Sequence, residues 1–272
     1  MVANFAALDG ADLYTQVSGA ESGPDVLLLH GLFGMGSNLG ALARALADRY
    51  RVHQIDLPNH GRSPWEDVST IATLAAAVAA YARTATPGPY SLLGHSLGGK
   101  VAMQLALSAP EQLRALVVAD IAPVSYPPSH DRVFAAIRAV DAVAVASRAE
   151  ARAIMERHVD EAAVVQFLLL SLARDDEGRY RWRFNWRALE ENYTSLREAP
   201  AAAEPCPAPA LFVYGALSAY VGEAGIAAAR QLFPAAQFER LEGAGHWLHA
   251  EKPQAFNDAV RHFLDRLHHV PA

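Results

Sequence analysis

The pentapeptide Gly94-His95-Ser96-Leu97-Gly98 constrains the fold of this chain more than any other stretch of its sequence. It follows the apolar run 90–93 and leads into the helix-like run 100–108. A serine at a sharp turn from a strand into a helix is held in a strained backbone conformation, and small neighbours let the two elements approach closely. The pattern therefore predicts that the Ser96 hydroxyl is exposed where a buried strand ends and a helix begins.

Strand-like and helix-like patterns alternate along most of the chain. Continuous apolar runs such as 26–29 are typical of buried parallel strands, and apolar residues spaced three and four apart are typical of helices. The predicted strands cover 4–8, 13–17, 26–29, 51–57, 90–93, 113–119, 211–214 and 237–241. The predicted helices between them cover 37–50, 70–83, 100–109, 223–232 and 253–267. We therefore predict an α/β fold with a mostly parallel eight-stranded sheet and helices on both faces.

The pattern changes between residues 122 and 209. Prolines cluster at both ends of this segment, as expected for an inserted module with defined hinges. Its predicted elements are helices at 131–143, 147–158 and 161–173 and a short strand at 180–184. We expect a core domain formed by 1–121 and 210–272 and a helical cap formed by 122–209. Large apolar residues of this cap either pack together or line an acyl pocket: Phe134, Ile137, Phe167, Leu168, Trp182, Phe184 and Trp186.

Composition and charge exclude several classes of protein. The net charge is −6 and no cluster of Lys and Arg is interleaved with aromatic residues, so nucleic acid is not an expected partner. The single cysteine, Cys206, cannot form an intrachain disulfide, and no signal-peptide pattern opens the chain. The apolar run 167–170 is far shorter than the ~20 residues that cross a bilayer. We therefore expect a cytoplasmic protein without a membrane span, and the sequence leaves its oligomeric state open.

A nucleophilic serine needs a neighbouring base, because its hydroxyl is barely ionised at neutral pH. His246 is the candidate, since Gly243-Ala244-Gly245-His246-Trp247 directly follows the last predicted strand and can place an imidazole over the carboxyl edge of the sheet. For His30, His60 and His95 we prefer a structural role, in which their hydrogen bonds fix the loops around the site.

The attack of a serine on a carbonyl group creates an oxyanion, which two backbone amides commonly stabilise. Leu97 follows Ser96 at the start of a helix, where the helix dipole also favours negative charge. The run His30-Gly31-Leu32-Phe33-Gly34 follows a predicted strand and can aim the Leu32 amide toward the same point. Leu32 and Leu97 are therefore the predicted oxyanion hole. The alternative is a plain glycine-rich turn, and no Gly-Lys-Ser/Thr sequence follows that would indicate a phosphate loop.

Together these motifs resemble those of α/β-hydrolases with a helical cap, over essentially the whole chain. The subgroup that the chain resembles comprises the YbfF-like esterases and the abhydrolase-domain 11-like proteins. The resemblance is carried by His30-Gly31-Leu32-Phe33-Gly34, Asn59-His60-Gly61-Arg62-Ser63, Gly94-His95-Ser96-Leu97-Gly98-Gly99-Lys100, Asp120-Ile121-Ala122-Pro123 and Gly243-Ala244-Gly245-His246-Trp247. It implies a carboxylesterase or thioesterase that cleaves small acyl esters or thioesters through an acyl-enzyme, without a metal ion or organic cofactor.

The sequence departs from the α/β-hydrolase pattern at the acid of the catalytic triad. The common pattern places an Asp in the loop after the strand at 211–214, where this chain has Ser218. A neutral hydroxyl cannot stabilise an imidazolium as a carboxylate does. Asp120 directly follows the predicted strand at 113–119. With Asp120 as the acid, the order along the chain is nucleophile, acid and base, as is usual in this fold. We therefore predict Asp120 as the acid, with Glu223 as the alternative acid. A non-catalytic alternative for Asp120 is that its carboxylate caps the start of the inserted segment.

Two other functions are compatible with this pattern. A ligand receptor that uses the same fold and turns over slowly or not at all would keep these residues. A cofactor-free haloperoxidase or perhydrolase activity would use the same serine. Epoxide hydrolases and halide-displacing hydrolases need a carboxylate at the position of Ser96, so the serine argues against both.

Overall fold

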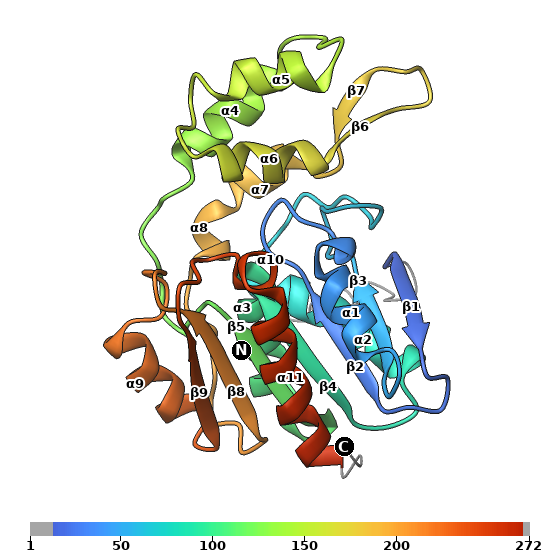
Figure 1. Ribbon diagram of the computed structural model, residues 1–272, viewed down its shortest axis with the longest axis vertical. Helices are drawn as coiled ribbons and strands as arrows, with labels where there is room; N and C mark the ends of the chain where they lie inside the picture. The colour runs from blue at the N-terminus through green and yellow to red at the C-terminus, as the bar shows by residue number, and fades with distance from the viewer. Residues whose placement is uncertain (1–12, 269–272) are drawn as a thin grey trace.

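The computed structural model describes residues 13–268, and a seven-stranded sheet lies at their centre (Figure 1). The strand order is β1-β3-β2-β4-β5-β8-β9. The strands are β1 Thr15–Gly19, β2 Asp25–Leu29, β3 Arg51–Ile55, β4 Tyr90–His95, β5 Leu113–Ala119, β8 Ala210–Gly215 and β9 Ala236–Leu241. β1 is antiparallel to β3, and every other neighbouring pair is parallel. The predicted α/β fold is confirmed, and the eighth predicted strand, 4–8, lies outside the described residues.

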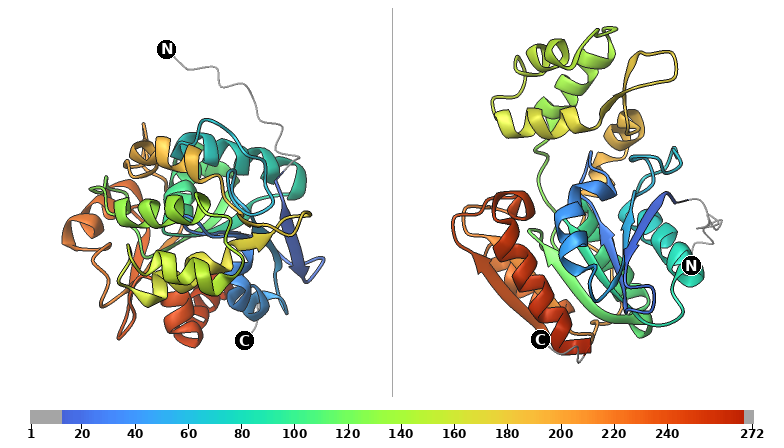
Figure 2. Two further views of the ribbon diagram at one scale, coloured as in Figure 1. Left: turned by 90° about the horizontal axis from the view of Figure 1, so that it is seen from above. Right: turned by 45° about the vertical axis from the view of Figure 1, so that its right-hand side comes forward.

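Helices cover both faces of this sheet (Figures 1 and 2). They are α1 Gly40–Leu46, α2 Ile71–Ala85, α3 Leu97–Ser108, α9 Glu223–Leu232, α10 Leu248–Glu251 and α11 Pro253–His268, with 3₁₀ turns η2 Gly36–Leu39 and η3 Pro110–Gln112. α1 and α11 pack on one face together with Val26 and Leu28 of β2. α2, α3 and α9 pack on the other face together with Leu27 and Leu29. Because both faces are covered, a central strand such as β2 is a continuous apolar run.

The chain leaves the sheet after β5 and returns to it at β8, and the segment between them, called the insertion here, lies across one end of the sheet (Figure 1). Its helices are α4 Asp131–Asp141, α5 Arg148–Met155, α6 Ala162–Leu170, α7 Trp186–Glu191 and α8 Tyr193–Leu196. An antiparallel hairpin of β6 Leu172–Arg174 and β7 Tyr180–Trp182 connects α6 to α7. The insertion therefore faces the edge of the sheet at which the predicted site residues lie.

Several predicted elements are corrected. The helix predicted at 161–173 ends at Leu170, because the Ser171 hydroxyl donates a hydrogen bond to the carbonyl oxygen of Phe33 at 2.8 Å and the chain turns into β6. The helix predicted at 37–50 is the 3₁₀ turn η2 followed by α1. The sequence does not predict α7, α8 and α10, because helices of four to six residues are too short to show a helical period.

Candidate active site

Ser96 lies in the turn between β4 and α3, with φ 53° and ψ −117°. A positive φ of this kind is strained for a residue that carries a side chain. The close approach of strand and helix requires glycine at two neighbouring positions. A Cβ on Gly94 would lie 2.0 Å from the carbonyl oxygen of Gly98, and a Cβ on Gly98 would lie 2.3 Å from that of Leu29. The sharp turn that the sequence predicts is therefore present, and Ser96 lines a cavity.

Asp120 and His246 come from different loops and contact each other. Asp120 directly follows β5, is completely buried and has a φ of 50°. Its Oδ2 lies 2.7 Å from Nδ1 of His246, which belongs to the loop after β9. Its Oδ1 accepts a hydrogen bond from the backbone N–H of Gly215 at 2.9 Å. Because an ionised carboxylate only accepts hydrogen bonds, Nδ1 of His246 carries the proton, and Nε2 of the neutral imidazole is left as an acceptor.

Ser218, at which the sequence departs from the expected pattern, also contacts Asp120. Its hydroxyl donates a hydrogen bond to Oδ2 of Asp120 at 2.5 Å and accepts one from the backbone N–H of Tyr220 at 3.2 Å. Glu223 is exposed at the start of α9, and no hydrogen bond or ion pair joins it to His246 in the part of the chain that the structure describes. The structure thus brings Asp120, rather than Glu223, to His246.

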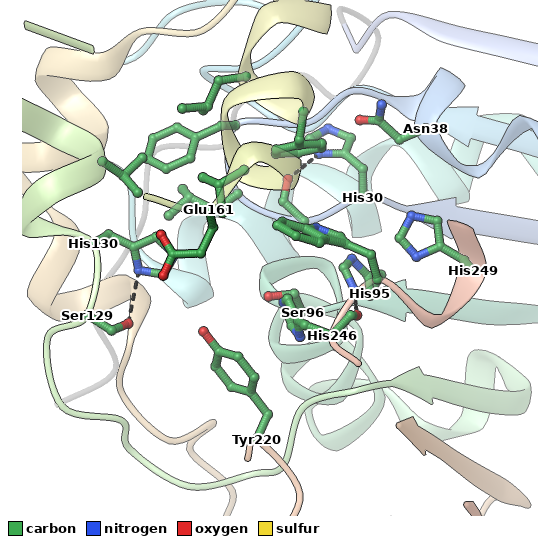
Figure 3. A pocket seen from close by; sticks show the side chains of 18 of the residues that line it. His30, Asn38, His95, Ser96, Ser129, His130, Glu161, Tyr220, His246 and His249 are labelled. Carbon is green, nitrogen blue, oxygen red and sulfur yellow. Dashed lines mark hydrogen bonds between the residues drawn. The ribbon is translucent and has the colours of Figure 1, made fainter. Parts of the chain in front are cut away.

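Ser96 and His246 line a shared cavity of about 290 Å³ between the core and the insertion (Figure 3). No hydrogen bond joins the two side chains among the described residues, and in unliganded enzymes such contacts often tighten only when substrate binds. Leu32 lines the same cavity, and Leu97 is the first residue of α3. Within residues 13–268, no backbone hydrogen bond uses the N–H of either leucine. Both amides are therefore available as donors.

Three buried histidines fix the loops around Ser96. The backbone N–H of Leu57 donates to Nε2 of His30 at 3.0 Å, so Nδ1 of His30 is protonated and donates to the carbonyl oxygen of Gly31 at 2.8 Å. Nε2 of His95 lies 2.9 Å from the carbonyl oxygen of His246 and donates to it. Burial lowers the pKa of His30 to about 4 and that of His60 to about 3. His30 and His60 are thus uncharged at pH 7.

The insertion supplies one wall of the cavity. Its lining residues are Ser129, His130, Val133, Glu161, Val164, Phe167 and Leu168. Of the seven large apolar residues that the sequence singles out, only Phe167 and Leu168 line the cavity. Trp182 and Phe184 instead stack inside the insertion with their ring centroids 5.1 Å apart. Helical spacing identifies buried faces, but it does not distinguish a face that packs from one that borders a cavity.

Two lining residues near His246 are absent from the sequence prediction. The ring of Tyr220 stacks on the imidazole of His246 with a centroid distance of 4.3 Å (Figure 3). The ring of His249 lies 4.5 Å from that of His95. No sequence pattern marks Tyr220, because its place depends on the loop between β8 and α9. The signal for His249 is its position three residues after His246.

Metal ligation and membrane crossing find no support in the described residues. Between residues 13 and 268, no three His, Cys, Asp or Glu side chains are grouped so that they could hold a metal ion. Over the same range, no helix combines the length and the apolar composition that a membrane span requires.

Comparison with known proteins gives the family. The profile of the Alpha/beta hydrolase family matches residues 26–259. The chain belongs to the alpha/beta hydrolase family. It is 40% identical over 244 residues to esterase YbfF of Escherichia coli strain K12, a match that covers 88% of this chain and 92% of the relative. It is 38% identical over 259 residues to the sn-1-specific diacylglycerol lipase ABHD11 of Mus musculus, covering 92% of this chain and 84% of the relative.

A solved structure shows the same likeness. The structure described as a marine microorganism esterase superposes with a TM-score of 0.89 at 34% identity and covers 93% of this chain and 99% of that chain. The family that the sequence resembles is therefore confirmed, and the chain is a hydrolase of the esterase and lipase type.

Proposed function

We propose that the protein is a serine hydrolase that cleaves carboxylic esters or acyl thioesters, with Ser96 as nucleophile, His246 as base and Asp120 as acid. The observation that carries this proposal is the 2.7 Å contact between Asp120 and Nδ1 of His246, beside a cavity that His246 and Ser96 share. A buried carboxylate that holds one imidazole nitrogen leaves the other free to take a proton.

The geometry supports an acyl-enzyme mechanism. As Ser96 Oγ attacks the acyl carbon, Nε2 of His246 takes the hydroxyl proton, and Asp120 stabilises the resulting imidazolium. The N–H groups of Leu32 and Leu97 donate to the oxyanion, which the N-terminus of α3 also favours. His246 then protonates the departing alcohol or thiol. Water, deprotonated by His246, releases the acid from Ser96 in the same way.

The insertion acts as a cap in this proposal, with residues 122–209 covering a core formed by 1–121 and 210–272. It supplies apolar lining such as Phe167 and Leu168 opposite Ser96. A pocket of this kind favours apolar acyl chains by ~0.8 kcal/mol for each methylene that it buries. The cavity of about 290 Å³ accommodates a small or medium-sized acyl substrate rather than a long chain along its whole length.

A panel of esters and acyl thioesters of graded chain length tests the function. We expect sustained turnover of at least one class and stoichiometric labelling of Ser96 by a fluorophosphonate, located by peptide mass spectrometry. A single burst of product without further turnover would instead identify a slow receptor on the same fold. Labelling of a residue other than Ser96 would contradict the proposed nucleophile.

A further inference from the structure

Among the Asp, Glu, Lys and Arg side chains of the described residues, one carboxylate lines the cavity at Ser96, and its charge is negative. That carboxylate belongs to Glu161, and no Lys or Arg is among the lining residues that the structure describes. Glu161 directly precedes α6, and its carboxylate points into the cavity near His130, on the side toward which the Tyr220 hydroxyl also points (Figure 3). A substrate in this cavity is therefore exposed to a negative charge that no Lys or Arg of the same cavity lining offsets.

Glu161 is solvent-exposed where it lines the cavity, and no hydrogen bond or ion pair holds its carboxylate among the described residues. Its side chain does not cap α6. Arg132 is close enough to Glu161 for their opposite charges to attract, but its guanidinium is paired with the neighbouring Asp160, with 2.7 Å between nitrogen and oxygen. A carboxylate left free at the border of an apolar cavity interacts with whatever part of a ligand comes near it.

Two histidines of the cavity lining, His130 and His249, do not neutralise this carboxylate. Nδ1 of His130 is held by the Tyr193 hydroxyl at 2.5 Å, and the Ser129 hydroxyl lies 3.2 Å from the same atom. Burial lowers the pKa of both His130 and His249 to about 4. Both rings are thus uncharged at pH 7, and they offer hydrogen bonds rather than charge.

The nearest lysine is also engaged. A second cavity of about 60 Å³ beside Ser96 is lined by Lys100 and Arg197. The ammonium of Lys100 donates to the backbone oxygens of Val124 at 2.8 Å and Arg197 at 2.9 Å, and also to that of Glu198. With three acceptors for three N–H groups, Lys100 has no donor left for an anionic substrate. Arg197 is also engaged, since its guanidinium donates to the backbone oxygen of Tyr126 at 2.5 Å and to the hydroxyl of Thr194 at 3.4 Å.

We propose that Glu161 is a specificity-determining residue, which makes the enzyme favour acyl substrates with a neutral or cationic end over those whose end carries a carboxylate. This inference rests on the proposed esterase function. It concerns the part of the substrate that approaches α6, and it predicts that esters of dicarboxylic acids are poor substrates.

Three p-nitrophenyl esters of equal chain length test the proposal: hexanoate, 6-aminohexanoate and the monoester of adipic acid. At low ionic strength we expect kcat/KM for the adipate monoester to be at least about fivefold below that of the hexanoate. In Glu161→Gln this ratio approaches one, and in Glu161→Lys it reverses. In 1 M salt the Debye length is about 3 Å, so the difference in kcat/KM between the adipate monoester and the hexanoate should become smaller in the unmodified protein. A parallel series of hexanoate esters places the same three charges on the alcohol.

Glu177→Gln is the matched control. Glu177 pairs with Arg179 in the turn of the β6–β7 hairpin and does not line the cavity, so the change in net charge is the same but the ratio is expected to stay at its original value. Equal rates for all three charges in both series, or discrimination that Glu161→Gln leaves intact, overturns the role of Glu161. Labelling of Ser96 by a neutral fluorophosphonate is followed in every variant, so that failure of the hydrolase proposal is seen separately.

Discussion

At Asp120, three donors from two segments of the chain converge on one buried carboxylate. The backbone N–H of Gly215, the hydroxyl of Ser218 and Nδ1 of His246 all donate to it. Hydrogen bonds to an ionised group are stronger than those between neutral groups, and a buried carboxylate without donors is costly. The contact with His246, on which the proposed mechanism depends, is therefore embedded in contacts that hold the carboxylate still.

Ser96 is the residue whose loss should abolish turnover. We expect Ser96→Ala to lower kcat/KM for ester hydrolysis by at least ~10³-fold, because no other group in the turn can form the acyl-enzyme. The circular dichroism spectrum and the unfolding midpoint should stay close to those of the unmodified protein. Near-normal activity of this variant would show that another residue is the nucleophile.

Asp120 and Glu223 can be separated by isosteric substitutions. Asp120→Asn keeps the shape of the side chain, and Asn tolerates the positive φ at this position. It removes the charge and can donate to Nδ1 of His246, which favours the unproductive tautomer, so kcat should fall by ~10³ to 10⁴. Glu223→Gln should cost less than about tenfold, since Glu223 is exposed and does not contact His246. The reverse ranking in steady-state kinetics would assign the acid to Glu223.

At the scale of elements, the loop between β8 and α9 keeps a role although it lacks the expected carboxylate. Ser218 holds the same oxygen of Asp120 that accepts from His246. We expect Ser218→Ala to lower kcat by about three- to tenfold with little change in KM, because a charge-assisted hydrogen bond to the acid is lost while the substrate cavity is untouched. The conservative variant Ser218→Thr, which keeps the hydroxyl, should retain most of the rate. A change confined to KM would argue against this positioning role.

The sequence determines which elements exist better than it determines where they meet. β5 and α9 have the predicted bounds, because continuous or periodic apolar runs define both without reference to the rest of the molecule. The triad candidates are placed by their position after strands β4, β5 and β9. Position after a strand does not predict the roles of Ser218, Tyr220 and Glu161. Each of these roles depends on a loop conformation that brings together residues distant in sequence.

For the whole molecule, the buried histidines give stability a defined dependence on pH. Burial lowers the pKa of His30, His130 and His249 to about 4 and that of His60 to about 3, whereas a histidine in the unfolded chain titrates near ~6.5. Below ~6.5 the unfolded chain therefore binds protons that the folded chain does not, so the free energy of unfolding falls as the pH falls toward 4.

The slope of the free energy of unfolding against pH tests whether these buried histidines are neutral in the folded protein. Each such group lowers the free energy of unfolding by up to about 1.4 kcal/mol for each pH unit once the unfolded form is protonated. In urea unfolding at pH 7.5, 6 and 5, the free energy of unfolding should therefore fall steeply as the pH falls. In His60→Leu the slope should become shallower by up to that amount for each pH unit, even where the substitution changes the absolute stability. His60 is suited to this test because its ring is completely buried and does not line the cavity at Ser96. A stability that is flat from pH 7.5 to 5, or a slope that His60→Leu leaves unchanged, would mean that these rings take up protons in the folded protein.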